Sequence, residues 1–70
     1  MGTKNTPGKF DCYHKADPDE PLFVLLARDK HASILVELWA ALNDLDGESA
    51  AKSMEALKCA KDMRRYYDSL

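Results

Sequence analysis

The sequence has few cysteines and glycines and no long apolar run, and each of these absences removes a class of protein. Two cysteines cannot build the dense disulfide framework of a small secreted scaffold, and a reducing compartment would keep both as thiols. No apolar stretch approaches the roughly 18–20 residues that span a bilayer, and residues 1–8 lack the apolar centre of a signal peptide. The three glycines do not have the spacing of a phosphate-binding loop. We therefore expect a cytoplasmic protein with no membrane segment.

The length and the charge limit the function further. A chain of 70 residues has room for one domain, and at this size folding buries only about 60% of the surface of the unfolded chain. Such a small core usually needs a disulfide, a metal or a partner chain to support it, so we expect a homo-oligomer. The net charge of −2, from ten Lys and Arg against twelve Asp and Glu, creates no overall attraction to nucleic acid or to an anionic membrane.

The first part of the chain divides into a polar arm and a short apolar segment. Residues 1–9 are polar and are predicted to form a flexible arm, and residues 10–70 to form a single small helical domain. Residues 22–27 (LFVLLA) are the most apolar stretch. A short helix is the preferred interpretation, because Pro21 suits a first helical position. A strand paired with residues 10–14 in a β-ribbon is the alternative.

The second part of the chain predicts two helices. Asp29 is a candidate N-cap for the first, which is expected to end near Asp46 and Gly47. Apolar residues recur in it at the spacing of one helical face: Ile34, Leu35, Leu38, Trp39, Leu42 and Leu45. The second helix follows Gly47 with a similar pattern: Ala50, Met54, Leu57, Ala60, Met63, Tyr67 and Leu70. The link is so short that the two helices must be neighbours, which predicts a mainly α fold built on an antiparallel hairpin.

Two helices that share one seam cannot completely cover both the apolar residues 22–27 and the Trp39 side chain. We therefore expect an apolar strip on the surface, with Phe23, Leu26 and Trp39 as the interface residues that another copy or a host protein would cover.

Basic and aromatic side chains near the C-terminus are the candidate ligand-binding residues. Four bases could hold phosphate groups and two tyrosines could stack on a base: Lys58, Lys61, Arg64, Arg65, Tyr66 and Tyr67. The alternative is a solvated helix end whose tyrosines pack on a neighbour. Arg28, with Lys30 and His31, forms a second basic group at the start of the first helix, where an anion could also bind.

Catalytic and metal chemistry have little support. Cys12, His14, His31 and Cys59 are potential zinc ligands, but their spacing lacks the two close pairs typical of zinc modules. A Cys–His nucleophile would also need an oxyanion hole and a third, orienting group, which no motif provides. We expect no enzyme activity, no metal and no cofactor.

Three stretches of residues 10–42 resemble a known group of proteins. They are Phe10-x-Cys12-Tyr13-x-Lys15, Asp19-Glu20-Pro21-x-Phe23-Val24-Leu25-Leu26-Ala27-Arg28-Asp29, and Leu35-Val36-x-Leu38-Trp39-Ala40. Together they resemble small single-domain proteins encoded by bacteriophages and prophages. The resemblance covers about half the chain and carries no active-site residue.

The resemblance implies a phage accessory protein in the bacterial cytoplasm. Such proteins commonly block a host factor or bind a small signalling nucleotide. The expected function is therefore a non-enzymatic, oligomeric protein that sequesters an anionic, nucleotide-like immune signal and so inhibits host defence. An inhibitor or scaffold that binds a host protein is the alternative, and a small DNA-binding accessory protein is the third.

Overall fold

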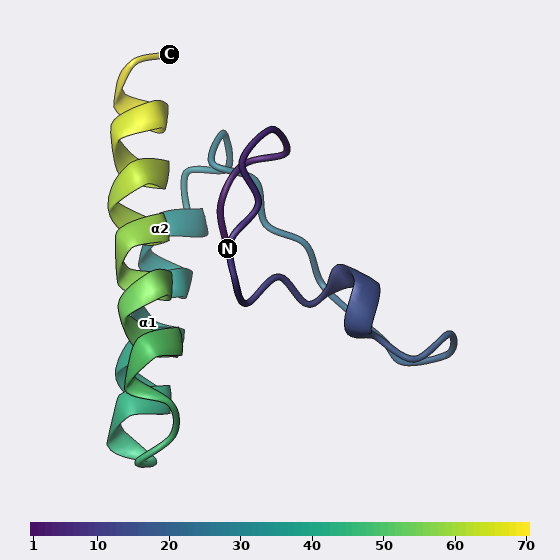
Figure 1. Cartoon of the computed structure of the whole chain (residues 1–70). Coiled ribbons are helices and arrows are strands. Elements are labelled where there is room, and N and C mark those ends of the chain that lie inside the picture. The colour runs from purple at the N-terminus through teal and green to yellow at the C-terminus, as the bar shows by residue number, and fades with distance from the viewer.

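A computed structural model describes all 70 residues and consists of a helical hairpin with an irregular N-terminal layer. Helix α1 spans Ala32–Leu45 and helix α2 spans Ala50–Asp68. A short 3₁₀ turn, η1, covers Tyr13–Lys15. In Figure 1 α1 lies directly behind α2, on which it packs, and residues 1–31 extend from one side of the pair. The predicted mainly α fold with a helical hairpin is confirmed.

Local sequence signals account for the turn between the helices. Gly47 adopts a φ of +73°, a left-handed conformation that glycine reaches without a Cβ clash. The N–H of Gly47 donates to the carbonyl of Asp44, and that of Glu48 donates to the carbonyl of Asn43, each at 3.1 Å. These are the two bonds of a Schellman C-cap. The Ser49 hydroxyl then accepts from the Lys52 N–H at 3.3 Å and caps α2.

The predicted N-cap of the first helix is wrong by two residues. α1 begins at Ala32 after His31, which makes no side-chain capping bond. The Asp29 carboxylate accepts the N–H of His31 at 2.9 Å, and the Asp29 carbonyl accepts the N–H of Ala32 at 3.0 Å. Asp29 therefore stabilises the turn that leads into the helix, a local bond that competes with an earlier helix start.

Both predictions for residues 22–27 are wrong, because the segment forms neither a helix nor a strand. Six residues are too few to offset the cost of nucleating a helix without packing support. The β-ribbon lacks its second strand, since residues 13–15 turn into η1. The apolar side chains stay largely in solvent, with exposed fractions of 83% for Phe23 and 51% for Leu26.

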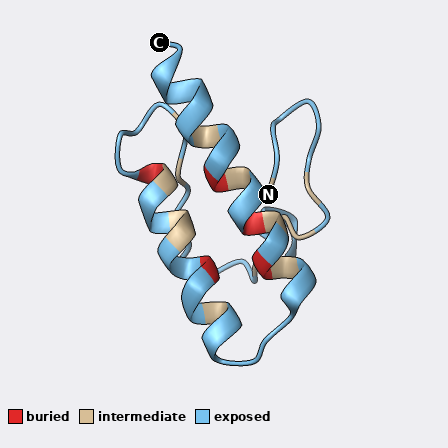
Figure 2. Ribbon diagram, turned by 90° about the vertical axis from the view of Figure 1, so that its left-hand side faces the viewer, coloured by how far each residue is buried: buried red, intermediate tan, exposed pale blue.

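Small residues form the interface between the helices. The five buried residues are Ala32 and Ala40 of α1 and Ser53, Ala56 and Ala60 of α2, and no large side chain is fully buried. Figure 2 shows the buried positions along the two packed helices. Side chains this short let the two backbones approach closely. The Asn43 amide donates to the Ser53 hydroxyl at 2.9 Å across the interface. The core of the hairpin is therefore thin.

The larger apolar face of α1 is not the one that packs on α2. Leu38 and Leu42 remain 56% and 51% exposed, and Trp39 remains 41% exposed. A period of 3.6 residues places these leucines on the side of α1 opposite the buried alanines. In α2, Ala60 of the predicted face is buried, whereas Met54 is 69% exposed. The alanine face occupies the interface, and Trp39 lies at its edge, where the Lys52 ammonium of α2 is 5.5 Å from the centroid of the indole ring.

Candidate functional site

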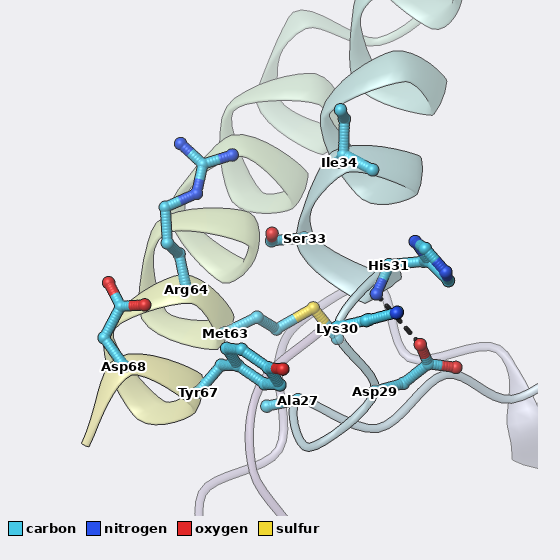
Figure 3. A pocket seen from close by; sticks show the side chains of 10 residues that line it. All are labelled: Ala27, Asp29, Lys30, His31, Ser33, Ile34, Met63, Arg64, Tyr67 and Asp68. Carbon is cyan, nitrogen blue, oxygen red and sulfur yellow. Dashed lines mark hydrogen bonds between the residues drawn. The ribbon is translucent and has the colours of Figure 1, made fainter. Parts of the chain in front are cut away.

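An open pocket lies where the start of α1 meets the end of α2. The antiparallel hairpin brings these two ends together, and the cavity between them has a volume of about 340 Å³ (Figure 3). Its walls come from the turn before α1, the first turn of α1 and the last turns of α2: Ala27, Asp29, Lys30, His31, Ser33, Ile34, Met63, Arg64, Tyr67 and Asp68. A cavity of this volume is large enough for a small organic ligand.

The pocket brings together part of the predicted site. Arg64 and Tyr67, which were predicted to bind phosphate and to stack on a base, both line it. Lys30 and His31, from the second basic group, face them from the other wall. Figure 3 shows Tyr67 beside Met63, close to the segment that precedes α1, whereas the Arg64 guanidinium extends along the helices.

The electrostatics of the pocket are balanced rather than strongly basic. Lys30 and Arg64 supply two positive charges, and Asp29 and Asp68 supply two negative charges. Arg64 donates to the Glu37 carboxylate of α1 at 3.1 Å, and both side chains are about half exposed. An exposed ion pair of this kind contributes about 0–1 kcal/mol, so a phosphate can replace Glu37 as the partner of Arg64.

The other predicted binding residues lie outside this pocket. Lys58, Lys61 and Arg65 recur at i, i+3 and i+7, which places them on the side of α2 opposite the buried residues. Lys58 is paired with Asp62 at 3.0 Å and lines a second cavity of about 230 Å³ near the N-terminal segment. Tyr66 does not line either cavity. The basic group that is continuous in sequence is therefore divided between two faces of the helix.

Arg28 is also outside both cavities. It is exposed on the turn before α1, two residues from Lys30, which does line the pocket at the hairpin end. The predicted basic group at the start of α1 is thus only partly brought into the pocket.

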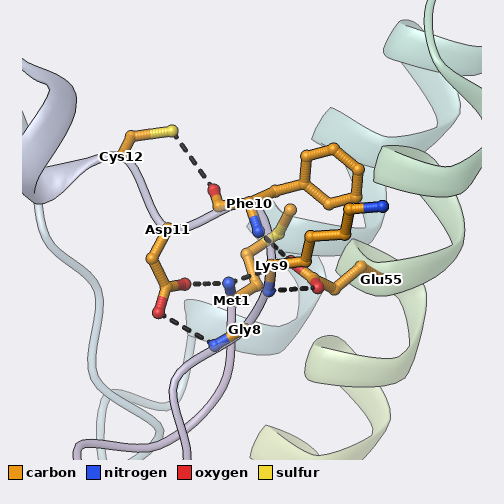
Figure 4. Close-up of polar contacts among 7 residues, drawn as sticks. All are labelled: Met1, Gly8, Lys9, Phe10, Asp11, Cys12 and Glu55. Atoms are coloured by element: carbon orange, nitrogen blue, oxygen red, sulfur yellow. Dashed lines mark hydrogen bonds and ion pairs between the residues drawn. The ribbon is translucent and has the colours of Figure 1, made fainter.

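A polar cluster around Glu55 connects the N-terminal segment to α2, and the sequence did not indicate it. The Glu55 carboxylate accepts the N–H of Lys9 at 2.8 Å and the N–H of Phe10 at 3.0 Å (Figure 4). The Met1 ammonium binds the same carboxylate at 3.0 Å and also contacts Asp11. The flexibility expected of residues 1–9 stays a prediction, and these bonds are the contacts that would limit it.

The hydrogen bonds at Glu55 affect its ionisation. Burial acts to raise the pKa of this carboxyl, but the bonds from the Met1 ammonium and from the amides of Lys9 and Phe10 outweigh it and lower the pKa below its ordinary value. Because its partners are backbone and terminal groups, Glu55 holds the N-terminal segment in place, and no sequence motif could have identified this role.

The two cysteines are separate free thiols, and no cluster of possible metal ligands is present. Both cysteines are free thiols, with Cys12 exposed and Cys59 partly buried. Burial raises the pKa of the Cys59 thiol and outweighs the Met1 ammonium, which acts to lower it. A raised pKa favours the thiol over the nucleophilic thiolate. No group of three or more His, Cys, Asp or Glu side chains is placed to hold a metal ion.

Neither helix combines the length and the apolar character that a bilayer crossing requires. Comparison of the chain with protein-family models, with curated proteins and with solved structures gives no match.

Proposed function

We propose that this chain is a non-enzymatic, homo-oligomeric binding protein that sequesters an anionic, nucleotide-like small molecule in the pocket at the hairpin end. The observation that carries the proposal is the meeting of Arg64 and Tyr67 from α2 with Lys30 and His31 from the start of α1 around one cavity. Cationic side chains bind phosphate oxygens, and a tyrosine ring offers a face on which a nucleobase can stack.

The oligomer is part of the proposal for a structural reason. The pocket is open to solvent, and its walls come only from residues 27–34 and from the last turns of α2. A ligand site usually buries 70–90% of a small ligand, roughly, so a neighbouring copy would supply the missing wall. The setting in a phage, with a host immune signal as ligand, is a prediction from the sequence resemblance.

Two adjacent arginines provide a matched test of the site. Arg64 lines the pocket, whereas Arg65 is exposed on another side of α2. In calorimetric titrations with cyclic dinucleotides and ADP-ribose derivatives, we expect Arg64→Gln to weaken binding about tenfold or more, since a charge-assisted hydrogen bond to phosphate is lost. Arg65→Gln removes the same charge and should change the affinity by less than about threefold.

Two results would remove the proposal. The first is the absence of heat with every ligand of the panel. The second is an equal loss of affinity in Arg64→Gln and Arg65→Gln, which would indicate general charge attraction rather than binding in the pocket.

An inhibitor or scaffold that binds a host protein is the second candidate. Its support is the exposure of Phe23, Leu26 and Trp39, because exposed aromatic and leucine side chains are typical anchors of protein interfaces. In this case Phe23→Ser should abolish the stoichiometric capture of one host protein, whereas Arg64→Gln should leave it unchanged. Capture that Phe23→Ser does not reduce would contradict this candidate.

A further inference from the structure

Helix α1 carries a leucine pattern that the hairpin does not use. Leu35, Leu38, Leu42 and Leu45 are separated by three, four and three residues. This is the a/d spacing of a heptad repeat, in which two helices pack side by side along one seam. Ile34 occupies a flanking g position and widens the apolar surface, whereas Trp39 at the e position borders α2, with the Lys52 ammonium over its ring. We call the four leucines the leucine stripe.

The leucine stripe faces away from the partner helix within the same chain. In the same heptad, Ala40 falls at position f, opposite the a/d seam, and Ala40 is buried against α2. The stripe remains in solvent, with exposed fractions of 46% for Leu35, 56% for Leu38, 51% for Leu42 and 81% for Leu45. α1 thus has one small-residue face for α2 and a second, larger apolar face without a partner.

The chain exposes more surface than a folded monomer of its mass, by about twice the area that one subunit of a stable dimer buries. Its accessible surface is 5910 Å², whereas a folded monomer of 7.9 kDa exposes about 4,400 Å². The excess is therefore about 1,500 Å². A stable interface buries about 800 Å² on each partner, so one such contact accounts for roughly half of the excess.

We propose that the leucine stripe docks on the leucine stripe of a second copy, with the two α1 helices antiparallel across a two-fold axis. The stripe is symmetric about residue 40, so in this alignment Leu35 meets Leu45 of the second copy and Leu38 meets Leu42. A patch that pairs with itself is what a two-fold dimer requires. The acids of α1, Glu37 and Asp44, lie at c positions outside the seam and do not repel.

The antiparallel alignment also suits the electrostatics of the helices, because the positive end of each α1 dipole lies beside the negative end of the other. With α2 packed behind each α1, the dimer is a four-helix arrangement. The inference rests on the oligomeric part of the proposed function and gives that oligomer a defined interface. Its tests use the protein without ligand, so a failure here is distinguishable from a failure of ligand binding.

The first experiment measures the mass of the full chain by light scattering coupled to size exclusion. We expect the mass of two chains for the wild type and of one chain for Leu38→Glu, because burying a carboxylate in the seam of both copies should weaken dimerisation at least roughly a hundredfold. Leu57→Glu makes the same change on α2 at a similarly exposed leucine and should keep the wild-type mass. A monomeric wild type, or a Leu38→Glu variant with the wild-type mass, overturns the proposal.

The second experiment tests the alignment without disturbing the seam by a charge. In a Cys12→Ser, Cys59→Ser background, a tagged Leu38→Cys chain is mixed with an untagged Leu42→Cys chain and oxidised mildly. The antiparallel pairing predicts that the mixed pair cross-links faster than either variant with itself. Faster cross-linking of each variant with itself, or none in any mixture, overturns the proposed arrangement.

Discussion

Enlarging one buried alanine between the helices provides the most direct test of the fold. Ala40 is 1% exposed and lies in the seam where α1 meets α2. Leucine at this position adds three carbon atoms to a contact that short side chains keep close. The next residue, Ala41, is exposed on the same helix and is the matched control. Leucine and alanine have similar helix propensities, so the two substitutions differ mainly in packing.

The expected cost follows from the size of the core. Overpacking a tight interface costs about 1–3 kcal/mol, and a domain of this length has a total stability of about 4–10 kcal/mol. Ala40→Leu should therefore remove a substantial fraction of the free energy of unfolding. Ala41→Leu should lower it by no more than about 0.5 kcal/mol, because Ala41 is exposed on the chain and a larger apolar side chain has room there.

Urea unfolding followed by far-UV circular dichroism measures both variants. With a slope of about 1 kcal/mol per molar urea, Ala40→Leu should lower the midpoint by about 1–3 M, and Ala41→Leu should lower it by less than about 0.5 M. Equal stability of Ala40→Leu and Ala41→Leu would contradict the close helix contact at Ala40. A cost of about 1–3 kcal/mol in Ala41→Leu together with none in Ala40→Leu would mean that the opposite face of α1 packs on α2.

Two further substitutions test the ends of the hairpin and the attachment of the N-terminal segment. Glu55→Gln should remove a pH-dependent part of the stability. Because the pKa of Glu55 is lowered in the folded chain, its stabilisation is complete above the ordinary value of 4.5 and is lost as the pH falls through the lower folded value. The midpoint temperature of thermal unfolding, measured below pH 4.5, should therefore vary less with pH in Glu55→Gln than in the control Glu48→Gln. An equal variation in the two variants would contradict the role of Glu55. Gly47→Ala should cost about 1–2 kcal/mol in urea unfolding, since no atom lies near the added Cβ and only the positive φ is strained. A smaller cost for Gly47→Asn is expected, and a neutral Gly47→Ala would contradict the left-handed turn.

The secondary structure of residues 32–68 was predictable because its signals are local. Helical spacing of apolar residues, a glycine at the turn and a short link determine two adjacent helices, and the structure has α1 and α2 on either side of Gly47. The prediction failed at residues 22–27, where an apolar run without a period has no preferred partner. It also failed at the start of α1, where Asp29 stabilises a turn instead of the first helical residue.

The candidate site was only partly predictable for a related reason. Bases that are neighbours in the sequence point in different directions on a helix, so Arg64 lines the pocket while Arg65 does not. The contacts of Glu55 with Lys9 and Phe10 join residues more than forty positions apart, and no local pattern records them.

The sequence by itself determined the two helices, the glycine turn between them and the surplus of apolar surface. Only the tertiary structure decided which face of α1 packs on α2. Both faces have helical spacing, and the choice depends on how closely two backbones can approach. The alanine face of α1 allows a close contact, so the larger leucine face is left to solvent or to a second copy.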